Sequence, residues 1–204
     1  MKVPLVFVGS GEFAREVAAM VMYTSLNEKY DILGFVSGEK PKEDARLPAE
    51  FLGDLEFLSD LRKSYPNLAV SICIGNPSVR AKVYQKMEHF DLNYPNLIHP
   101  LSEIGWNHRP DLIIGKGNII SQGCIFTTDI RLGDFNILNL GCLVGHDVWI
   151  SNFCTVMHGA KFSGGATVGD KVLVGTGSAF IRKCDVPSGV IVPSYSVVRG
   201  TFIP

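Results

Sequence analysis

The sequence predicts two successive parts: a small Rossmann-like α/β domain with a parallel sheet over residues 1–99, and a parallel β-helix of hexapeptide repeats over residues 100–204. Two observations support this prediction. Short apolar segments alternate with helical patterns through the first hundred residues, which is typical of a parallel sheet covered by helices. From residue 114 onward, a large apolar residue recurs at every sixth position without interruption.

The six-residue period is the stronger signal. All fifteen positions counted in sixes from Ile114 are apolar, which chance gives roughly once in 10⁵ sequences with 46% hydrophobic residues. Four positions after each of them stands a second, mostly small residue. This pattern is typical of coils made of three short strands, in which residues eighteen apart stack at about 4.8 Å. The large residues are Ile114, Ile120, Phe126, Leu132, Leu138, Val144, Ile150, Val156, Phe162, Val168, Val174, Phe180, Val186, Val192 and Val198.

The first hundred residues alternate between strand and helix patterns. Strands are expected at 5–8, 30–36, 68–74 and 96–98, and helices at 12–23, 55–64 and 77–90. Gly11 and Gly75 follow two of the strands, at the sheet edge where open α/β sheets bind ligands. The turn between the first strand and its helix suits a phosphate or a carboxylate. NAD is disfavoured, because Ala14 replaces the third glycine of the dinucleotide motif and no acidic residue directly follows the second strand.

Composition excludes several classes of partner. The 19 basic and 20 acidic residues nearly balance, which argues against nucleic acid or an anionic membrane surface. No apolar run reaches the ~18 residues that span a bilayer, and glycines interrupt the first strand too early for a secretory signal. A cytoplasmic location is therefore expected. Four of the five cysteines occupy small inward positions and are interpreted as buried thiols, and none has metal-ligand spacing.

One histidine stands in a turn of the repeat, outside the inward positions. His146 precedes Asp147, and a carboxylate beside an imidazole can fix one tautomer and make a better general base. Gly164 lies one coil away, where its bare backbone N–H could donate to a developing oxyanion. The same residues also fit a surface histidine with an aspartate that only aids solubility. Spacing alone leaves both interpretations open.

The remaining histidines are assigned no catalytic role. His158 lies twelve positions from His146 and therefore on a different face of the coil, so the two are not expected to share a metal within one chain. His99 and His108 flank the junction between the two parts and are interpreted as structural. Trp149 precedes an inward residue and should point outward, where a trimer interface is the favoured environment.

Four stretches carry a resemblance to a known family. They are residues 8–17 (VGSGEFAREV), 74–80 (IGNPSVR), 97–100 (LIHP) and 139–147 (NLGCLVGHD). Together they resemble the sialic acid O-acetyltransferase (NeuD/PglD-type) family, which includes N-acetyltransferases of nucleotide-linked 4-amino sugars. The resemblance implies a left-handed β-helix, a homotrimer with active sites between adjacent β-helices, and acetyl transfer from acetyl-CoA. The acceptor would be an amine or hydroxyl of a sugar, nucleotide-linked in many members and used in surface polysaccharide or glycan biosynthesis.

The resemblance also implies roles for individual residues. His146 would be the general base, Asp147 would raise its basicity, and Asn139 would lie near the acceptor. The Gly164 amide would meet the thioester oxygen. The remaining implied residues are Thr155, Thr176 and Ser194 for the CoA channel, and Ser10, Gly11, Glu12 and Gly75 for the acceptor. No metal is implied.

The chain departs from the family at two places in its first part. Family members commonly read Gly-Gly-His where this chain has Gly11-Glu12-Phe13, and their second strand ends in acidic residues that bind a uridine, whereas this one ends Val36-Ser37-Gly38. Two alternatives therefore stay open beside acetyl transfer. One is a zinc-dependent lyase or hydrolase of the carbonic anhydrase kind, and the other is a non-catalytic trimeric scaffold that binds a nucleotide sugar.

Overall fold

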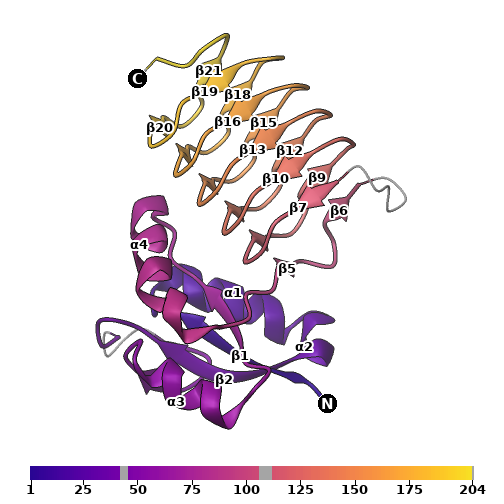
Figure 1. The fold of residues 1–204 in the computed structure, drawn as a ribbon. Helices are drawn as coiled ribbons and strands as arrows, with labels where there is room; N and C mark the ends of the chain where they lie inside the picture. The colour runs from indigo at the N-terminus through magenta and orange to yellow at the C-terminus, as the bar shows by residue number, and fades with distance from the viewer. Residues whose placement is uncertain (42–45, 106–111, 204) are drawn as a thin grey trace. The chain divides into compact units, whose positions relative to one another are not determined.

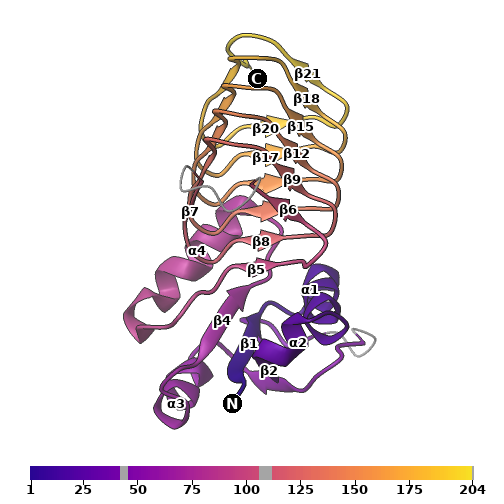
Figure 2. The ribbon, with the colours of Figure 1, turned by 90° about the vertical axis from the view of Figure 1, so that its right-hand side faces the viewer.

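A computed structural model describes residues 1–41, 46–105 and 112–203. The chain divides into two compact units, each shown in Figures 1 and 2. The first contains Met1–Gly75 and Val79–Leu97, and the second contains Asn76–Ser78 and Ile98–Pro204. His108, interpreted above as structural, lies outside the described residues.

The first unit is built on a four-stranded parallel sheet with strand order β3-β2-β1-β4. The strands are β1 (Val3–Val8), β2 (Tyr30–Val36), β3 (Phe51–Gly53) and β4 (Ala69–Ile72). The helices are α1 (Glu12–Met22), α2 (Leu26–Lys29), α3 (Phe57–Ser64) and α4 (Pro77–Met87), followed by the 3₁₀ turn η1 (Glu88–Phe90). Central strand β1 is almost wholly buried, as its continuous apolar run predicts for a sheet covered on both faces.

Most of the expected elements are present within a few residues of their predicted bounds. No sequence pattern predicts β3, because a three-residue edge strand is too short to show an alternating pattern. The strand expected near residue 96 exists as β5 (Leu97–Ile98), but it joins a sheet of the β-helix and not the sheet of the first unit. The order β2-β1-β4 makes the carboxyl end of β1 a topological switch point, where open α/β sheets bind ligands.

The second unit is a parallel β-helix whose short strands form three stacked sheets (Figure 2). Sheet I contains β7 (Ile113–Ile114), β10 (Arg131–Leu132), β13 (Trp149–Ile150), β16 (Thr167–Val168) and β19 (Asp185–Val186). Sheet II contains β5, β8 (Ile119–Ile120), β11 (Ile137–Leu138), β14 (Thr155–Val156), β17 (Leu173–Val174) and β20 (Ile191–Val192). Sheet III contains β6 (Glu103–Ile104), β9 (Ile125–Phe126), β12 (Leu143–Val144), β15 (Lys161–Phe162), β18 (Ala179–Phe180) and β21 (Val197–Val198).

Residues eighteen apart pair in adjacent coils, as the period predicts. Leu132 is in register with Ile150, and Ile150 with Val168. Three corners join the sheets, and each is named here by one of its residues. The His146 corner leads from sheet III to sheet I, the Asp134 corner from sheet I to sheet II, and the Thr176 corner from sheet II to sheet III.

The turns repeat one backbone conformation. From residue 117 to residue 195, the residue three after each large inward position has a positive φ between 53° and 77°. Glycine adopts this left-handed conformation without cost, and Asp or Asn tolerates it better than most other residues. The residues with side chains at these positions are Asp129, Phe135, Asp147, Phe153, Lys171, Lys183 and Tyr195.

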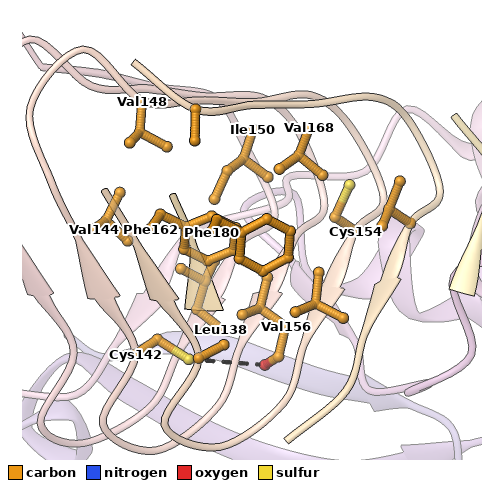
Figure 3. Packing of buried hydrophobic residues seen from close by; sticks show 14 of the residues in the cluster. Leu138, Cys142, Val144, Val148, Ile150, Cys154, Val156, Phe162, Val168 and Phe180 are labelled. Carbon is orange, nitrogen blue, oxygen red and sulfur yellow. Dashed lines mark hydrogen bonds between the residues drawn. The ribbon is translucent and has the colours of Figure 1, made fainter. Parts of the chain in front are cut away.

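The interior of the β-helix is apolar and closely packed (Figure 3). Phe162 and Phe180 stack with ring centroids 4.4 Å apart and an interplanar angle of 16°. Both rings are almost completely buried, at 3% and 0% exposure. Their alignment follows from the eighteen-residue register, which places the two side chains in consecutive coils of sheet III.

Replacing Phe180 with alanine should remove one ring of this stack and leave a cavity that the coils cannot close. We expect the free energy of unfolding to fall by about 3–5 kcal/mol, measured by denaturant titration. Phe180→Leu keeps most of the buried volume and serves as the control, with a clearly smaller loss expected. Equal losses for both variants would contradict a packing origin.

Candidate active site

His146 stands at the middle of a turn that joins β12 to β13, and two backbone hydrogen bonds hold this turn between its neighbours. The Asp147 N–H donates to the Thr128 carbonyl at 3.2 Å, and the Gly165 N–H donates to the His146 carbonyl at 2.9 Å. Asp147 occupies the left-handed position with φ 59°. The repeat therefore fixes the backbone positions from which the imidazole and the carboxylate project.

His146 and Asp147 form the pair that the sequence predicts. Nδ1 of His146 lies 2.7 Å from Oδ2 of Asp147. Because an ionised carboxylate only accepts hydrogen bonds, this contact assigns the proton to Nδ1 and leaves the Nε2 lone pair free. The two side chains are 56% and 65% exposed, so Nε2 is open to a ligand. The geometry is that of a general base held in one tautomer.

Gly164 lies in the next coil, directly against the imidazole. A Cβ built on Gly164 would stand 2.5 Å from Nε2 of His146 and closer still to Cε1. Its φ is not positive, so the turn itself does not require glycine here. Within the described ranges, the Gly164 N–H has no hydrogen-bond acceptor. The structure thus brings together a free Nε2, a bare Cα and an unoccupied backbone donor.

In the Asp134 corner, side-chain oxygens accept hydrogen bonds from the equivalent backbone N–H groups. There, the Lys116 N–H donates to Oδ1 of Asp134 at 2.9 Å. The Asp134 N–H donates in turn to Oδ1 of Asn152, and the Asn152 N–H donates to Oδ1 of Asp170, both at 2.8 Å. This ladder of side chains satisfies one turn donor per coil. The free Gly164 N–H therefore belongs to a corner that lacks such a ladder, which leaves its amide available to a ligand.

The other expected catalytic and CoA-binding residues lie elsewhere on the β-helix. Asn139 is in the Thr176 corner, only 4% exposed, and its Nδ2 donates to the Val156 carbonyl at 3.2 Å. Thr176 and Ser194 occupy the same corner in consecutive coils, and Thr155 is buried in β14 of sheet II. The structure thus separates this set from the His146 corner within one chain.

A groove of about 570 Å³ adjoins the His146 corner on the outer face of sheet I. Its lining includes the carboxylates of Asp129 and Asp147, the side chain of Arg131 and the ring of Trp149. Trp149 points outward and is 51% exposed, as the repeat predicts. The groove offers both charged and apolar contacts beside His146.

The first unit contains a separate pocket of about 730 Å³ at the carboxyl ends of β1, β2 and β4. All four residues assigned to acceptor binding, Ser10, Gly11, Glu12 and Gly75, line it. Gly11 is the N-cap of α1 and supplies no capping side chain, so the first turn of the helix leaves backbone donors for an anion. The pocket therefore fits a phosphate-bearing ligand.

Gly9 makes the narrow part of this pocket possible. Its φ is +113°, and a Cβ there would lie 3.0 Å from the Cys73 carbonyl oxygen. The Gly9 N–H also donates to the Val36 carbonyl at 2.8 Å. The turn after β1 is consequently held tightly between the ends of β2 and β4.

Sequence reasoning missed several residues of this pocket. Arg15, Glu39 and Lys40 also line it, so it contains charges of both signs. Glu39 lies three residues beyond the end of β2, and the chain there turns back over the strand ends. The sequence suggested no carboxylate at this place because the strand itself ends in Val36-Ser37-Gly38. The structure supplies one from the following loop.

Arg80 was also missed, and it is 1% exposed although charged. Its Nη1 donates to the Ile74 carbonyl at 2.5 Å and to the Gly75 carbonyl at 3.3 Å. These bonds hold the loop after β4 in place and so position Gly75. An arginine in a helical pattern is normally interpreted as solvent-exposed, so no sequence pattern predicts this role.

Cys73 also lines the pocket, yet burial raises the pKa of its thiol to about 12. All five cysteines are free and buried. We expect iodoacetamide at about pH 8 to modify none of them in the folded protein, because all five sulfur atoms are buried away from the reagent. Mass spectrometry should detect labelling only after denaturation. Rapid native labelling of Cys73 would contradict the burial described here.

The described ranges contain neither a membrane-spanning helix nor a group of metal-binding side chains. None of the helices there is long and apolar enough to cross a membrane. No group of three or more His, Cys, Asp or Glu side chains there is arranged to hold a metal ion.

Comparison with known proteins places these features in context. Residues 4–87 match the model of the PglD N-terminal domain. No curated protein sequence matches the chain significantly.

Solved structures resemble the chain over almost its full length. A mutant of perosamine N-acetyltransferase from Caulobacter crescentus, in complex with CoA and GDP-perosamine, superposes with a TM-score of 0.85 at 24% identity. The similarity covers 97% of this chain and 90% of that one. The acetyltransferase domain of PglB from Neisseria gonorrhoeae, in complex with acetyl coenzyme A, gives 0.78 at 22% identity, covering 99% and 93%. WeeI from Acinetobacter baumannii gives 0.69 at 23% identity, covering 96% and 95%.

These similarities confirm the predicted fold class, a small parallel-sheet domain followed by a left-handed β-helix. They also confirm the resemblance suggested by the motifs for the part of the chain that the family model matches. Residues 4–87 thus match the PglD N-terminal domain model, and they are followed here by a β-helix like that of the solved structures.

Proposed function

We propose that this protein transfers an acetyl group from acetyl-CoA to an amine or hydroxyl of a sugar, with a nucleotide-linked amino sugar as the favoured acceptor. One observation carries the proposal: the free Nε2 of His146 and the free N–H of Gly164 meet in adjacent turns of the β-helix. A base for the nucleophile and a donor for an oxyanion are the two groups that acyl transfer requires.

The mechanism follows from these atoms. Nε2 of His146 takes a proton from the acceptor as its nitrogen or oxygen attacks the thioester carbonyl carbon. The carbonyl oxygen becomes an oxyanion and accepts a hydrogen bond from the Gly164 N–H. Collapse of this intermediate breaks the carbon–sulfur bond and releases the CoA thiolate, which receives the proton from His146. Direct attack is favoured, because every cysteine is buried and unavailable as a nucleophile.

Asp147 supports the base without touching the acceptor. Its hydrogen bond to Nδ1 keeps the imidazole in the tautomer that exposes Nε2, and its charge stabilises the imidazolium that forms during attack. General-base assistance is worth ~10²–10⁴ in rate, and positioning of the two substrates supplies much of the rest.

The first unit supports a nucleotide-linked acceptor. Its pocket offers the N-terminus of α1 to a diphosphate and the Glu39 carboxylate to hydroxyl or N–H donors. The protein from C. crescentus, which has the same fold, is described in complex with GDP-perosamine.

We further propose a cytoplasmic homotrimer that acts in the biosynthesis of a surface polysaccharide or glycan. Asn139, Thr155, Thr176 and Ser194 lie away from the His146 corner of their own chain. If the roles implied by the resemblance hold, one site must combine residues of two adjacent β-helices. The exposed ring of Trp149 supports such a contact. Sedimentation equilibrium tests the trimer.

The function is tested by measuring thiol release from acetyl-CoA with a panel of 4-amino nucleotide sugars, free amino sugars and sialic acids. Acceptor-dependent release is the expected result, and the acceptor that supports turnover identifies the substrate class. Absence of release with every acceptor would favour the non-catalytic scaffold. Stoichiometric zinc in the purified protein, together with lyase or hydrolase activity, would favour the carbonic anhydrase alternative.

A further inference from the structure

Two of the five cysteines stack on one another in the Thr176 corner. Cys124 and Cys142 directly precede β9 and β12, and these strands pair in register through Ile125 and Leu143. The Ile125 N–H donates to the Cys142 carbonyl at 2.9 Å, which joins the two coils at this point. Consecutive coils are about 4.8 Å apart, and disulfides join Cα atoms that are roughly 4.4–6.8 Å apart. The register therefore places the two cysteines within disulfide distance.

The two thiols also interact with each other inside the β-helix. Both cysteines are 0% exposed. A hydrogen bond from the Cys142 thiol lowers the pKa of Cys124 against the opposing effect of burial. The same hydrogen bond, together with burial, raises the pKa of Cys142. The pair thus combines one sulfur that ionises more readily with a second sulfur that keeps its proton, and the thiolate is the nucleophilic form.

No side chain stands at the turn position in front of either thiol. Gly123 and Gly141 precede the two cysteines at the left-handed position of their turns. A Cβ on Gly141 would have no heavy atom within 4 Å, and one on Gly123 would touch only the Gly141 backbone, at 3.8 Å. The corner is therefore open as far as the backbone in front of the thiols. A reagent close to water in size can approach them there, whereas the larger iodoacetamide cannot.

The two other cysteines of the β-helix have neither feature. Cys154 precedes β14 of sheet II and Cys184 precedes β19 of sheet I, and the residues eighteen positions away from each are not cysteines. Phe153, which precedes Cys154, stacks on Phe135 with ring centroids 5.2 Å apart. Lys183 precedes Cys184. These two thiols therefore serve as internal controls for the stacked pair.

We propose that Cys124 and Cys142 are a redox modification site, at which hydrogen peroxide forms a disulfide between two coils of the β-helix. The Cys124 thiolate attacks one peroxide oxygen and the O–O bond breaks, which leaves a sulfenic acid on Cys124 and one water formed with the thiol proton. The Cys142 sulfur then attacks the Cys124 sulfur, and the S–O bond breaks to release a second water. The two thiols lose two hydrogens in total, and the peroxide is reduced to two waters.

The disulfide changes the surroundings of Asn139. In the reduced protein, the Cys124 thiol donates to the Asn139 carbonyl at 3.2 Å. A disulfide has no S–H group, so oxidation removes this hydrogen bond. The resemblance assigns Asn139 to the acceptor site, and oxidation therefore reaches a residue of the proposed function. Formation of the disulfide does not itself depend on that function.

The test exposes the folded full-length protein to hydrogen peroxide, blocks the remaining thiols with iodoacetamide after denaturation, and maps the peptides by mass spectrometry. We expect one disulfide-linked pair of peptides containing Cys124 and Cys142, a mass loss of about 2 Da before blocking, and recovery of both thiols with dithiothreitol. These two thiols should disappear at least ~10-fold faster than those of Cys154 and Cys184, because the neighbouring thiol traps the sulfenic acid.

Cys142→Ala removes the second sulfur, and Cys184→Ala is the matched control. Each replacement introduces the residue that an adjacent coil already carries at the same inward position, Ala160 and Ala166 respectively. Cys142→Ala should abolish the disulfide, and Cys184→Ala should leave it unchanged. Survival of both stacked thiols in wild type, loss of all the β-helix thiols at equal rates, or disulfides between other cysteine pairs would each overturn the inference. None of these outcomes bears on acetyl transfer, which the acceptor panel tests separately.

Discussion

Replacing His146 with alanine is expected to lower acceptor-dependent thiol release at least ~100-fold while leaving the fold unchanged. The imidazole is half-exposed and its side-chain hydrogen bond is to Asp147, so its loss removes the proposed base without opening the core. The KM for acetyl-CoA should change little, because the proposed contact with the thioester lies on the backbone N–H of Gly164 and not on the imidazole. Steady-state kinetics with the acceptor identified by the panel measure both quantities.

His158→Ala provides the matched control. His158 stands at the same position of its hexapeptide as His146 but in the Thr176 corner. Its replacement should cost far less than that of His146. Equal losses would indicate that any turn histidine matters, and retained activity in His146→Ala would refute the general-base assignment and favour the scaffold interpretation.

Gly164→Ala should be nearly as damaging, by displacing the base. The added methyl would meet the imidazole at 2.5 Å from Nε2, so the ring must rotate away from its bond to Asp147. A displacement of about 1 Å at a catalytic group can cost about 10²-fold in rate. We expect a loss of that order in kcat with an unchanged unfolding midpoint, because every other residue at this repeat position from Lys116 to Ser194 carries a side chain.

A double-mutant cycle separates this steric effect from damage to the turn. In the His146→Ala background the imidazole is gone, so adding Gly164→Ala should cause little further loss of residual activity. Additive losses in the double variant would show that alanine disturbs the oxyanion donor or the turn itself. Circular dichroism and thermal unfolding of all three variants check that the comparison is between folded proteins.

The sequence alone determined the coil architecture and the place of His146 and Asp147 within it. A period of six in large apolar residues leaves one way to bury them all, so it fixes the register of eighteen and with it the stacking of Gly164 on His146. The pairing of His146 with Asp147 could also be expected, because the two residues are neighbours in the sequence. The strands and helices of the first unit also followed from their patterns, since long apolar periodicities depend little on distant contacts.

Only the tertiary structure decided the details that depend on three-dimensional proximity. It showed that the imidazole leaves no room for a Cβ at Gly164, that Glu39 reaches the pocket from a loop, and that buried Arg80 holds Gly75. It placed β5 in the β-helix and Asn139 in a different corner from His146. Patterns of polarity state which side of an element faces inward. They do not state which distant side chains meet, because those contacts arise only when separate elements pack.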